Sequence, residues 1–535
     1  MSRPAAAAEA PARRHGHERT GRFAVLVATG ILLSRISGLV RQRFLSHYFG
    51  LGDVADAFTA AFRIPNLVRN LFGEGVLSAS FIPVYARLLA EDDREGATRV
   101  AGAIAALLAL ITSVVVLIGV LATPWLLALI APGFTGAKRE LTIRLVRIFF
   151  PAAGILVMSA WCLGVLNSHR RFFLSYTAPI VWNVAIIVTL VAFGRLDAPR
   201  LAVAAAWGAV VGSALMFGVQ LPSVMGLLPH LHLRTRLHDA HVRAVVRNFG
   251  PVFIGRGVVQ ISAYVDTLLA SLLGSGAMMG LSSAQILYLL PVSLFGMSVS
   301  AAELPVMASA VGESAEVVAY LRTRLDAGLR RIAFLVIPSA VAFLALGDIL
   351  AGALFQTGRF TRADTMYVWA ILAGSAVGLL ATTLGRLYSS TYYALRDTRT
   401  PLRFAVVRVV LTIALGVGFA LYVPRLVGLD LKWGAAGLTA SAGVAGWLEF
   451  LLLRHTLNAR IGRTGLAAAF VVKLWAAALA GAAAAWGVKL TLGTGHPIVL
   501  AIAALIPYGL IYFGVAELLG VPEARTVVRA ALRRG

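Results

Sequence analysis

The fold of this chain is decided by Val54-Ala-Asp-Ala-Phe-Thr-Ala-Ala-Phe-Arg-Ile-Pro-Asn-Leu-Val-Arg-Asn-Leu-Phe-Gly-Glu-Gly-Val76. The stretch has the length and apolar content of a membrane span, yet it contains four ionisable residues, Asp56, Arg63, Arg69 and Glu74. Ionisable groups are costly at bilayer depth, so they usually face a protein interior or a wet cavity and mark the route of something polar. The preceding apolar stretch also contains deep arginines, which suggests a cationic cavity inside a membrane protein.

Composition supports this interpretation. The chain has 535 residues, of which 59% are hydrophobic and 13% are charged, and its mean hydropathy is +0.83. A soluble protein would have about 25% charged residues. Apolar blocks of roughly 20 residues match the thickness of the bilayer core, whereas a β-barrel would show short alternating segments. We therefore predict an all-α polytopic membrane protein.

The hydropathy pattern predicts about fourteen transmembrane helices, near 23–46, 54–73, 99–130, 143–166, 176–195, 201–224, 247–273, 282–309, 332–354, 366–391, 403–423, 434–454, 467–490 and 497–519. The segment 76–89 is expected to be an amphipathic surface extension of the second span. The net charge of +24 is spread over short loops, so it indicates orientation and not a nucleic-acid partner. Arginines concentrate in alternate loops, which predicts that both termini are cytoplasmic.

Prolines reveal an internal repeat. Pro83 and Pro305 are 222 residues apart, as are Pro179 and Pro401, and each pair occupies the same place relative to its spans. The offset equals six spans, so the two copies have the same orientation, as in transporters built from two lobes around a central site. The predicted domains are a disordered basic tail (1–22), an N-lobe (23–224), a basic cytoplasmic linker (225–246), a C-lobe (247–455), two C-terminal helices (456–520) and a second basic tail (521–535).

The arginines of the first two spans are candidate ligands for a diphosphate. Arg35, Arg41 and Arg69 could instead reach the interface from near their span ends, but Arg35 is about twelve residues into its span. Guanidinium groups match phosphate oxygens in a two-pronged geometry, so several of them at one site suit a diphosphate. Asp56 and Glu74 could bind a proton or cation, or neutralise the arginines.

Other ionisable residues within spans are open to two interpretations. Arg256 is either a further cavity charge or a packed structural arginine, and Asp266 lies on nearly the same helix face. Glu303 and Glu449 are either hydrogen-bonded structural groups or ion-coupling sites. No nucleotide, zinc or serine-nucleophile motif is found, so we expect a non-enzyme without cofactors, driven by an ion gradient or the membrane potential.

Several motifs resemble those of the MurJ (MviN) lipid II flippases, in order from about residue 23 to 520. They are Ser34-Arg-Ile-Ser-Gly-Leu-Val-Arg41, Asp56-Ala-Phe58, Pro65-Asn-Leu-Val-Arg69, Glu74-Gly75, Ala131-Pro-Gly-Phe134, Ala178-Pro179 with Asn183, Gln220-Leu-Pro222, Gln260-Ile-Ser262, Phe355-Gln-Thr-Gly-Arg-Phe360 and Tyr392-Tyr-Ala-Leu-Arg-Asp-Thr-Arg-Thr-Pro401. The first cluster is the most specific.

The resemblance implies a member of the multidrug/oligosaccharidyl-lipid/polysaccharide exporter superfamily in the bacterial cytoplasmic (inner) membrane. The substrate of the family is lipid II, undecaprenyl-diphosphate-MurNAc-pentapeptide-GlcNAc, which moves to the periplasmic leaflet for cell wall synthesis. Implied substrate-binding residues are Arg35, Arg41, Asp56, Asn66, Arg69 and Glu74. Membrane lipids are implied partners, and wall-synthesis and division machinery are further candidates.

The sequence departs from the family pattern in three places. Gln42 stands where many members have Asp after the second arginine of span 1. Span 8 lacks the arginine that many members have a few residues before the proline, here Pro291, and Arg256 on the neighbouring span could supply the missing charge. Some members of the family hold sodium in the second lobe. Asp266 is present here, and Glu303 is a second candidate for ion coupling. Arg408 in span 11 would repel a cation and could pair with Asp266, which argues against sodium.

Two alternatives to lipid II transport stay open. One is a flippase for another polyprenyl-diphosphate-linked oligosaccharide, which should lack the Pro-Asn-Leu-x-Arg and Glu-Gly cluster. The other is a non-transporting membrane scaffold for wall synthesis, in which the deep charges would tolerate substitution. A drug or cation antiporter fits less well, since it would need an acidic cavity.

Overall fold

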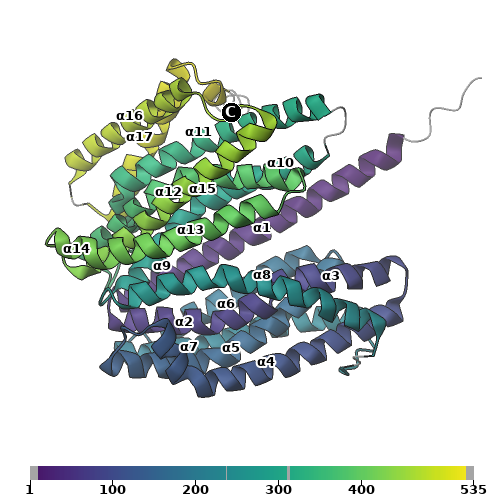
Figure 1. Cartoon of the computed structure of the whole chain (residues 1–535). Coiled ribbons are helices and arrows are strands. Elements are labelled where there is room, and N and C mark those ends of the chain that lie inside the picture. The colour runs from purple at the N-terminus through teal and green to yellow at the C-terminus, as the bar shows by residue number, and fades with distance from the viewer. Residues whose placement is uncertain (1–9, 236–237, 310–313, 494, 526–535) are drawn as a thin grey trace, which may run out of the picture. The chain divides into compact units, whose positions relative to one another are not determined.

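The computed structural model describes residues 10–235, 238–309, 314–493 and 495–525, with side chains described for all of these except 10–28, 254–256, 258–259, 261–263 and 314. Most of the described residues are helical, and no strand occurs among them (Figure 1). The all-α fold predicted from the hydropathy pattern is therefore confirmed.

The helices pack as two units. The first contains residues up to Tyr48 and Ala57–Tyr264, and the second contains Phe49–Asp56 and the chain from Val265. Because this division passes through three helices, the predicted lobe and linker boundaries stay predictions. Helices from the first half of the chain are α1 (Ala10–Phe49), α2 (Asp53–Phe72), α3 (Glu74–Ala90), α4 (Arg94–Ile130), α5 (Gly136–Ser168), α6 (Phe172–Ala192), α7 (Ala198–Leu227) and α8 (Ala240–Ser271).

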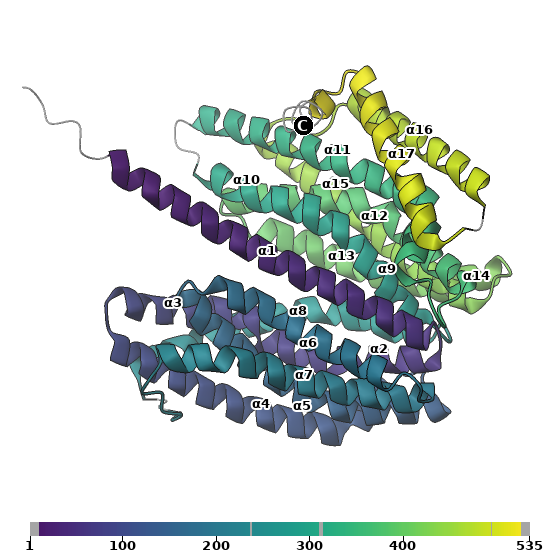
Figure 2. The same cartoon turned by 180° about the vertical axis from the view of Figure 1, so that it is seen from behind.

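Helix α5 is the centre of the first unit. It packs against α3, α4, α6 and α7, and α6 also packs along α7 (Figure 1 and Figure 2). The indole of Trp161 on α5 is buried and donates a hydrogen bond to the carbonyl oxygen of Ala101 on α4, at 3.1 Å. This bond satisfies the indole N–H, which would otherwise be unpaired in an apolar interior.

Helices of the second unit include two π-helical segments. The elements are α9 (Ala277–Pro291), η1 (Val292–Met297), α10 (Ser298–Ala308), α11 (Ser314–Phe355), α12 (Arg362–Ala394), α13 (Arg399–Val417), η2 (Gly418–Tyr422), α14 (Val423–Leu426), η3 (Leu431–Trp433), α15 (Gly434–Ile461), α16 (Ala468–Leu492) and α17 (Pro497–Leu518). The first π-helical segment, η1, directly follows Pro291, which cannot donate a backbone hydrogen bond, so the predicted span 282–309 is locally rewound there.

Packing within the two units follows the same scheme, as a repeat requires. In the second unit α12 is central and packs against α10, α11, α13 and α15, just as α5 packs against α3, α4, α6 and α7 in the first. The paired prolines fall in corresponding helices: Pro83 in α3 and Pro305 in α10, then Pro179 in α6 and Pro401 in α13. The repeat inferred from proline spacing therefore has a structural counterpart.

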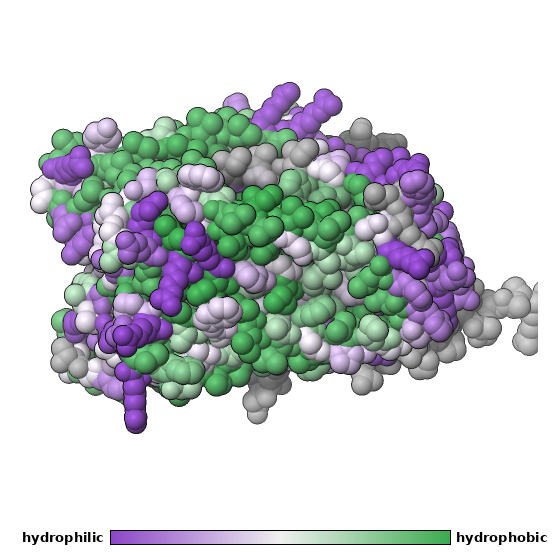
Figure 3. Space-filling model, turned by 90° about the horizontal axis from the view of Figure 1, so that it is seen from below, coloured by the Kyte–Doolittle hydropathy of each residue, from purple (hydrophilic) through white to green (hydrophobic). Residues whose placement is uncertain are grey.

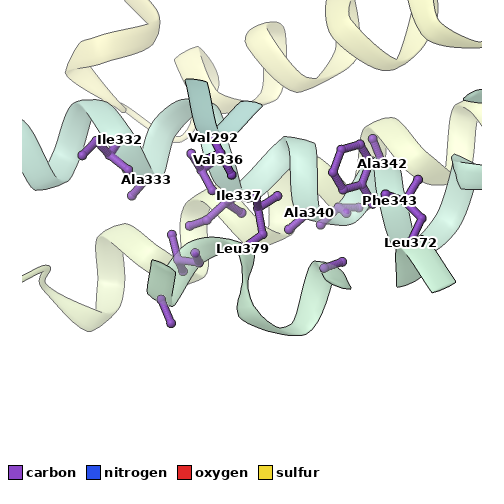
Figure 4. Close-up of a cluster of buried hydrophobic side chains, with 14 of the residues drawn as sticks. Val292, Ile332, Ala333, Val336, Ile337, Ala340, Ala342, Phe343, Leu372 and Leu379 are labelled. Atoms are coloured by element: carbon purple, nitrogen blue, oxygen red, sulfur yellow. The ribbon is translucent and has the colours of Figure 1, made fainter. Parts of the chain in front are cut away.

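The core of the second unit lies between α11, α12 and neighbouring helices. Val292, Val336, Ile337 and Leu379 are all buried and lie close together in Figure 4. Helices α12 and α15 approach closely, since a Cβ built on Gly378 would lie 2.4 Å from the Cα of Gly443. Small residues at such crossings allow helices to pack without large side chains, as is common in membranes. Helix α16 packs on α11 and α17 at the periphery of this unit.

The surface is that of a membrane protein. Among the described residues, eleven helices or helix runs are long and apolar enough to cross a membrane. Large apolar side chains are exposed on them, including Trp125 at 77% and Leu510 at 69%. Figure 3 shows hydrophobic side chains over the middle of one face and hydrophilic ones gathered toward its ends. The eleven do not include α1, α2 or α8, so the count of fourteen stays a prediction.

Two segments outside the predicted spans, 76–89 and the N-terminal segment, are helical. The extension expected at 76–89 is a separate helix, α3, whose buried side chains recur at helical spacing, including Leu77, Phe81, Tyr85 and Leu88. At the N-terminus, α1 begins at Ala10, so the helix includes residues 10–22, where the sequence predicted a disordered tail. Residues 1–9 lie outside the described part of the chain.

Candidate functional site

Arg69 and Glu74 lie on either side of the junction between α2 and α3. Arg69 is in the last turn of α2, and Glu74 is the first residue of α3. Gly73 separates the two helices, and a Cβ there would lie 2.2 Å from the carbonyl oxygen of Arg69. Only glycine fits at this junction without displacing the backbone. The side chains of Arg69 and Glu74 are both solvent-accessible, so a substrate can reach them.

Arg41 lies in a defined cage of polar and aromatic side chains. Its guanidinium donates a hydrogen bond to Asn183 Oδ1 at 3.0 Å, and Asn183 Nδ2 donates to Ser37 Oγ at 2.8 Å. The guanidinium carbon lies 5.1 Å from the ring centroid of Trp182 and 5.5 Å from that of Phe62, and these two rings stack on each other. Such cation–π contacts are stronger when the cation is desolvated. Arg41 is therefore held in place before any ligand binds.

Arg35, by contrast, is exposed on α1, which continues as a helix through Gly38. Asn66 is half-buried on α2, three residues before Arg69, so the two share a helix face. The predicted arginines and Asn66 are thus all on α1 and α2.

Helix α8 contributes polar partners to α2 within the first unit. Asn70 Nδ2 donates to Gln260 Oε1 at 3.3 Å, and the Tyr264 hydroxyl donates to the carbonyl oxygen of Arg63 at 3.1 Å. Position 256 is one helical turn before Gln260, so it belongs to the same face of α8. The side chain of Arg256 lies outside the described residues, and its predicted role as a cavity charge stays a prediction.

Asp56 has a role that the sequence did not indicate. Its carboxylate is fully buried and accepts hydrogen bonds from the amides of Gly276, at 2.8 Å, and Met279, at 3.0 Å. These amides are at the N-terminus of α9, where unpaired N–H groups and the helix dipole favour a negative charge. Asp56 therefore caps α9, and a substrate-contacting role for it stays a prediction.

The two glutamates singled out in the second unit are ion-paired. Glu303 is buried on α10 and lies 2.7 Å from Arg324 and 3.4 Å from Arg331, both on α11. Glu449 on α15 accepts from Arg408 on α13 at 3.1 Å. These contacts support the structural interpretation of both glutamates that the sequence had left open beside ion coupling.

Asp266 is half-buried on α8, and its predicted part in ion coupling is not tested by these contacts. Among the described residues, no group of three or more His, Cys, Asp or Glu side chains has the arrangement of a metal site. The expectation that sodium is not the coupling ion likewise stays a prediction.

Sequence reasoning missed the aromatic part of the Arg41 cage. Asn183 belonged to a family motif, but nothing in the sequence distinguished Phe62 or Trp182 from the many aromatic residues that membrane helices present to lipid. Gln260 was likewise part of a motif without an assigned partner. Helical spacing cannot identify such residues, because each contact joins different helices.

Comparison with known proteins identifies the family. The model of the family "Lipid II flippase MurJ" matches residues 45–505. The chain belongs to the MurJ family. The lipid II flippase MurJ of Burkholderia cenocepacia is 32% identical over 449 residues, covering 82% of this chain and 84% of that protein. The probable lipid II flippase MurJ of Bdellovibrio bacteriovorus is 34% identical over 460 residues, covering 84% of each.

Solved structures show the same fold. A MurJ lipid II flippase in an inward closed conformation is similar with a TM-score of 0.75 and 23% identity, covering 92% of this chain and 98% of that one. An inward-facing multidrug resistance MATE transporter of the MOP superfamily is similar with a TM-score of 0.63 and 19% identity, covering 82% and 98%. At these identities the likeness concerns the fold alone, which is similar to that of MurJ and MATE transporters.

Proposed function

We propose that this MurJ-family protein is a lipid II flippase, a transporter and not a catalyst. It moves the undecaprenyl-diphosphate-linked peptidoglycan precursor from the cytoplasmic to the periplasmic leaflet by alternating access. The observation that carries the proposal is the family match over residues 45–505, which includes the α2 segment with Arg69, together with the preorganised Arg41. The multi-pass helical fold supports a location in the bacterial inner membrane, and the arginines in alternate loops favour cytoplasmic termini.

The chemistry of α1 and α2 suits a diphosphate. Arg41 has five N–H donors, of which one is used by Asn183, and its Nε has no partner among the described residues. The Arg41 guanidinium is already held against Phe62 and Trp182, so its side chain loses little conformational entropy when phosphate oxygens bind. The cost of ordering the side chain therefore takes little from the free energy of binding. Arg35 and Arg69 supply further positive charge from exposed positions, and Glu74 limits the net charge when no substrate is bound.

The membrane potential is the proposed driving force. An inside-negative potential favours outward movement of an anionic head group by about 2.3 kcal/mol per charge per 100 mV. The same potential favours return of the empty cationic site toward the cytoplasm. The polyprenyl tail stays in lipid throughout, since only the polar head group has to cross.

The decisive experiment combines depletion with leaflet-resolved labelling. Cells depleted of this protein are supplied with the unaltered chain or with R41A, R41K or R69A, and lipid II exposed at the periplasmic face is labelled. We expect exposure to fall on depletion and to recover with the unaltered chain but not with R41A or R69A. R41K should recover partly, because lysine keeps the charge but loses the planar stacking and paired donors.

Arg200→Ala is the matched control. Arg200 is exposed on α7 and pairs at 3.3 Å with Asp197, so its removal takes away an arginine without touching the cage. Unchanged lipid II exposure after depletion would refute the flippase proposal. If R41A and R69A both supported full exposure, the protein would act as a scaffold for wall synthesis or the division machinery. Loss of another lipid-linked oligosaccharide in place of lipid II would indicate the alternative substrate.

A further inference from the structure

A large cavity lined by many charged side chains lies at one end of the first unit and contains none of the residues of the proposed flippase site. Its volume is about 1430 Å³, and its walls are the end of α3, the start of α4, the ends of α5 and α7, and the chain that leads from α7 to α8. Each of these connections is arginine-rich and is predicted to be cytoplasmic. The lining contains four arginines, three histidines and three carboxylates, and none of the predicted substrate-binding residues.

The carboxylates in the cavity already have partners. Asp92 pairs with Arg94 at 3.2 Å, and Glu95 pairs with Arg99 at 2.7 Å. Asp239 accepts hydrogen bonds from the amides of His241 and Val242 at the start of α8. Two arginines, Arg170 and Arg234, line the cavity without a carboxylate in ion-pair distance among the described residues. The cavity therefore has uncompensated positive charge.

Arg170 occupies a backbone position that favours glycine. Its φ is +59°, in the left-handed region. The residue follows the last turn of α5, where its amide donates to Asn167 and the amide of Arg171 donates to Leu166, the bonding pattern of a Schellman motif. Glycine would adopt this conformation without strain, so an arginine here points to a use for its side chain.

The equivalent turn of the second unit provides an internal comparison. Arg396 has the same φ of +59°, and the amide of Asp397 closes the same bond pattern on Tyr392. There, however, Asp397 accepts from Arg460 at 2.7 Å, so the turn contains its own counter-charge. In the first unit the matching residue is Arg171. The left-handed arginine is common to both repeats, but only the first-unit turn lacks a carboxylate.

The side chain of His169 lines the cavity next to Arg170 and is held in place by Tyr85. One ring nitrogen lies 2.9 Å from the hydroxyl of Tyr85, which is fully buried on α3. Burial, together with the charges of Arg171 and Arg94, lowers the pKa of His169, so the ring is neutral at neutral pH. The ring positions α3 against the end of α5 without adding charge of its own.

We propose that this cavity binds a phosphate-bearing ligand, held mainly by Arg170 and Arg234. Guanidinium groups without counter-charge recognise phosphate oxygens through charged, paired hydrogen bonds. The volume exceeds that of a phosphate group, so the rest of the ligand also has room. The phosphate could belong to a soluble cytoplasmic metabolite or to the head group of an anionic lipid. This site is separate from the proposed flippase site and does not depend on it.

The test uses the purified full chain in nanodiscs with two probes. In one arm, pyrophosphate is titrated into protein in neutral-lipid nanodiscs. In the other, retention of phosphatidylglycerol is measured by native mass spectrometry. The variants are Arg170→Gly, alone and with Arg234→Ala, and the control is Arg396→Gly, which relaxes the same backbone conformation in the second unit.

Arg170→Gly separates binding from stability, because it removes the guanidinium while relieving the left-handed conformation. We expect it to keep or raise the thermal midpoint and to weaken binding of at least one probe by about tenfold, with a larger loss in the double variant. Arg396→Gly should leave binding unchanged. Loss confined to the pyrophosphate arm indicates a soluble ligand, and loss confined to the lipid arm indicates a head group. The proposal is overturned if neither probe binds, or if the double variant binds both as well as the unaltered chain.

Discussion

Replacing Asp56 by alanine should destabilise the second unit substantially. The substitution removes both hydrogen bonds to the amides of Gly276 and Met279 and leaves these groups buried at the start of α9. A hydrogen bond to a charged group contributes about 1.5–3 kcal/mol, and loss of a helix cap costs about 0.5–2 kcal/mol. Since these figures describe overlapping effects, we expect a loss of about 2–4 kcal/mol.

The assay is thermal unfolding of the detergent-solubilised chain, followed by tryptophan fluorescence. Asp56→Asn keeps one acceptor oxygen, so its midpoint should fall between those of the unaltered chain and Asp56→Ala. Asp197→Ala is the control, because Asp197 caps α7 from an exposed position and its loss should cost about 1 kcal/mol or less. An unchanged midpoint for Asp56→Ala, with transport lost, would refute the capping argument and favour a direct role in substrate binding.

Three further outcomes are expected. Gly73→Ala should lower the yield of folded protein, measured by size-exclusion chromatography, because the added Cβ would lie 2.2 Å from the carbonyl oxygen of Arg69; wild-type yield would contradict this. Glu303→Gln should lower the thermal midpoint by the equivalent of about 2–4 kcal/mol, because the buried carboxylate partner of Arg324 is lost; a rise would show that the ion pair costs more than it contributes. Hydrogen bonds from Thr400, then the guanidinium of Arg460, hold the pKa of Asp397 well below its usual range, so its stabilising effect should be complete above about pH 5, begin to fall as the pH drops below about 4, and be lost only when the pH falls below the lowered pKa. The midpoint difference between the unaltered chain and Asp397→Asn, followed against pH, should therefore shrink in acid, and a constant difference would contradict the assignment.

Much of the architecture could be predicted from the order of residues alone. The span expected at 143–166 lies within α5, Gly136–Ser168, and the one expected at 366–391 lies within α12, Arg362–Ala394. These predictions succeed because a bilayer requires long apolar helices whose backbone bonds are made internally. The repeat was also detectable, since prolines mark the same place in both copies of the fold.

The partners of the charged residues were decided by tertiary structure. Asp56 binds amides 220 and 223 residues later in the chain, and Arg41 binds Asn183 from a different helix. Helical periodicity shows which residues share a face, but not which face of another helix lies opposite. A buried charge must be paired wherever it packs, so the sequence by itself determined that these residues have partners, and only the folded chain determined which ones.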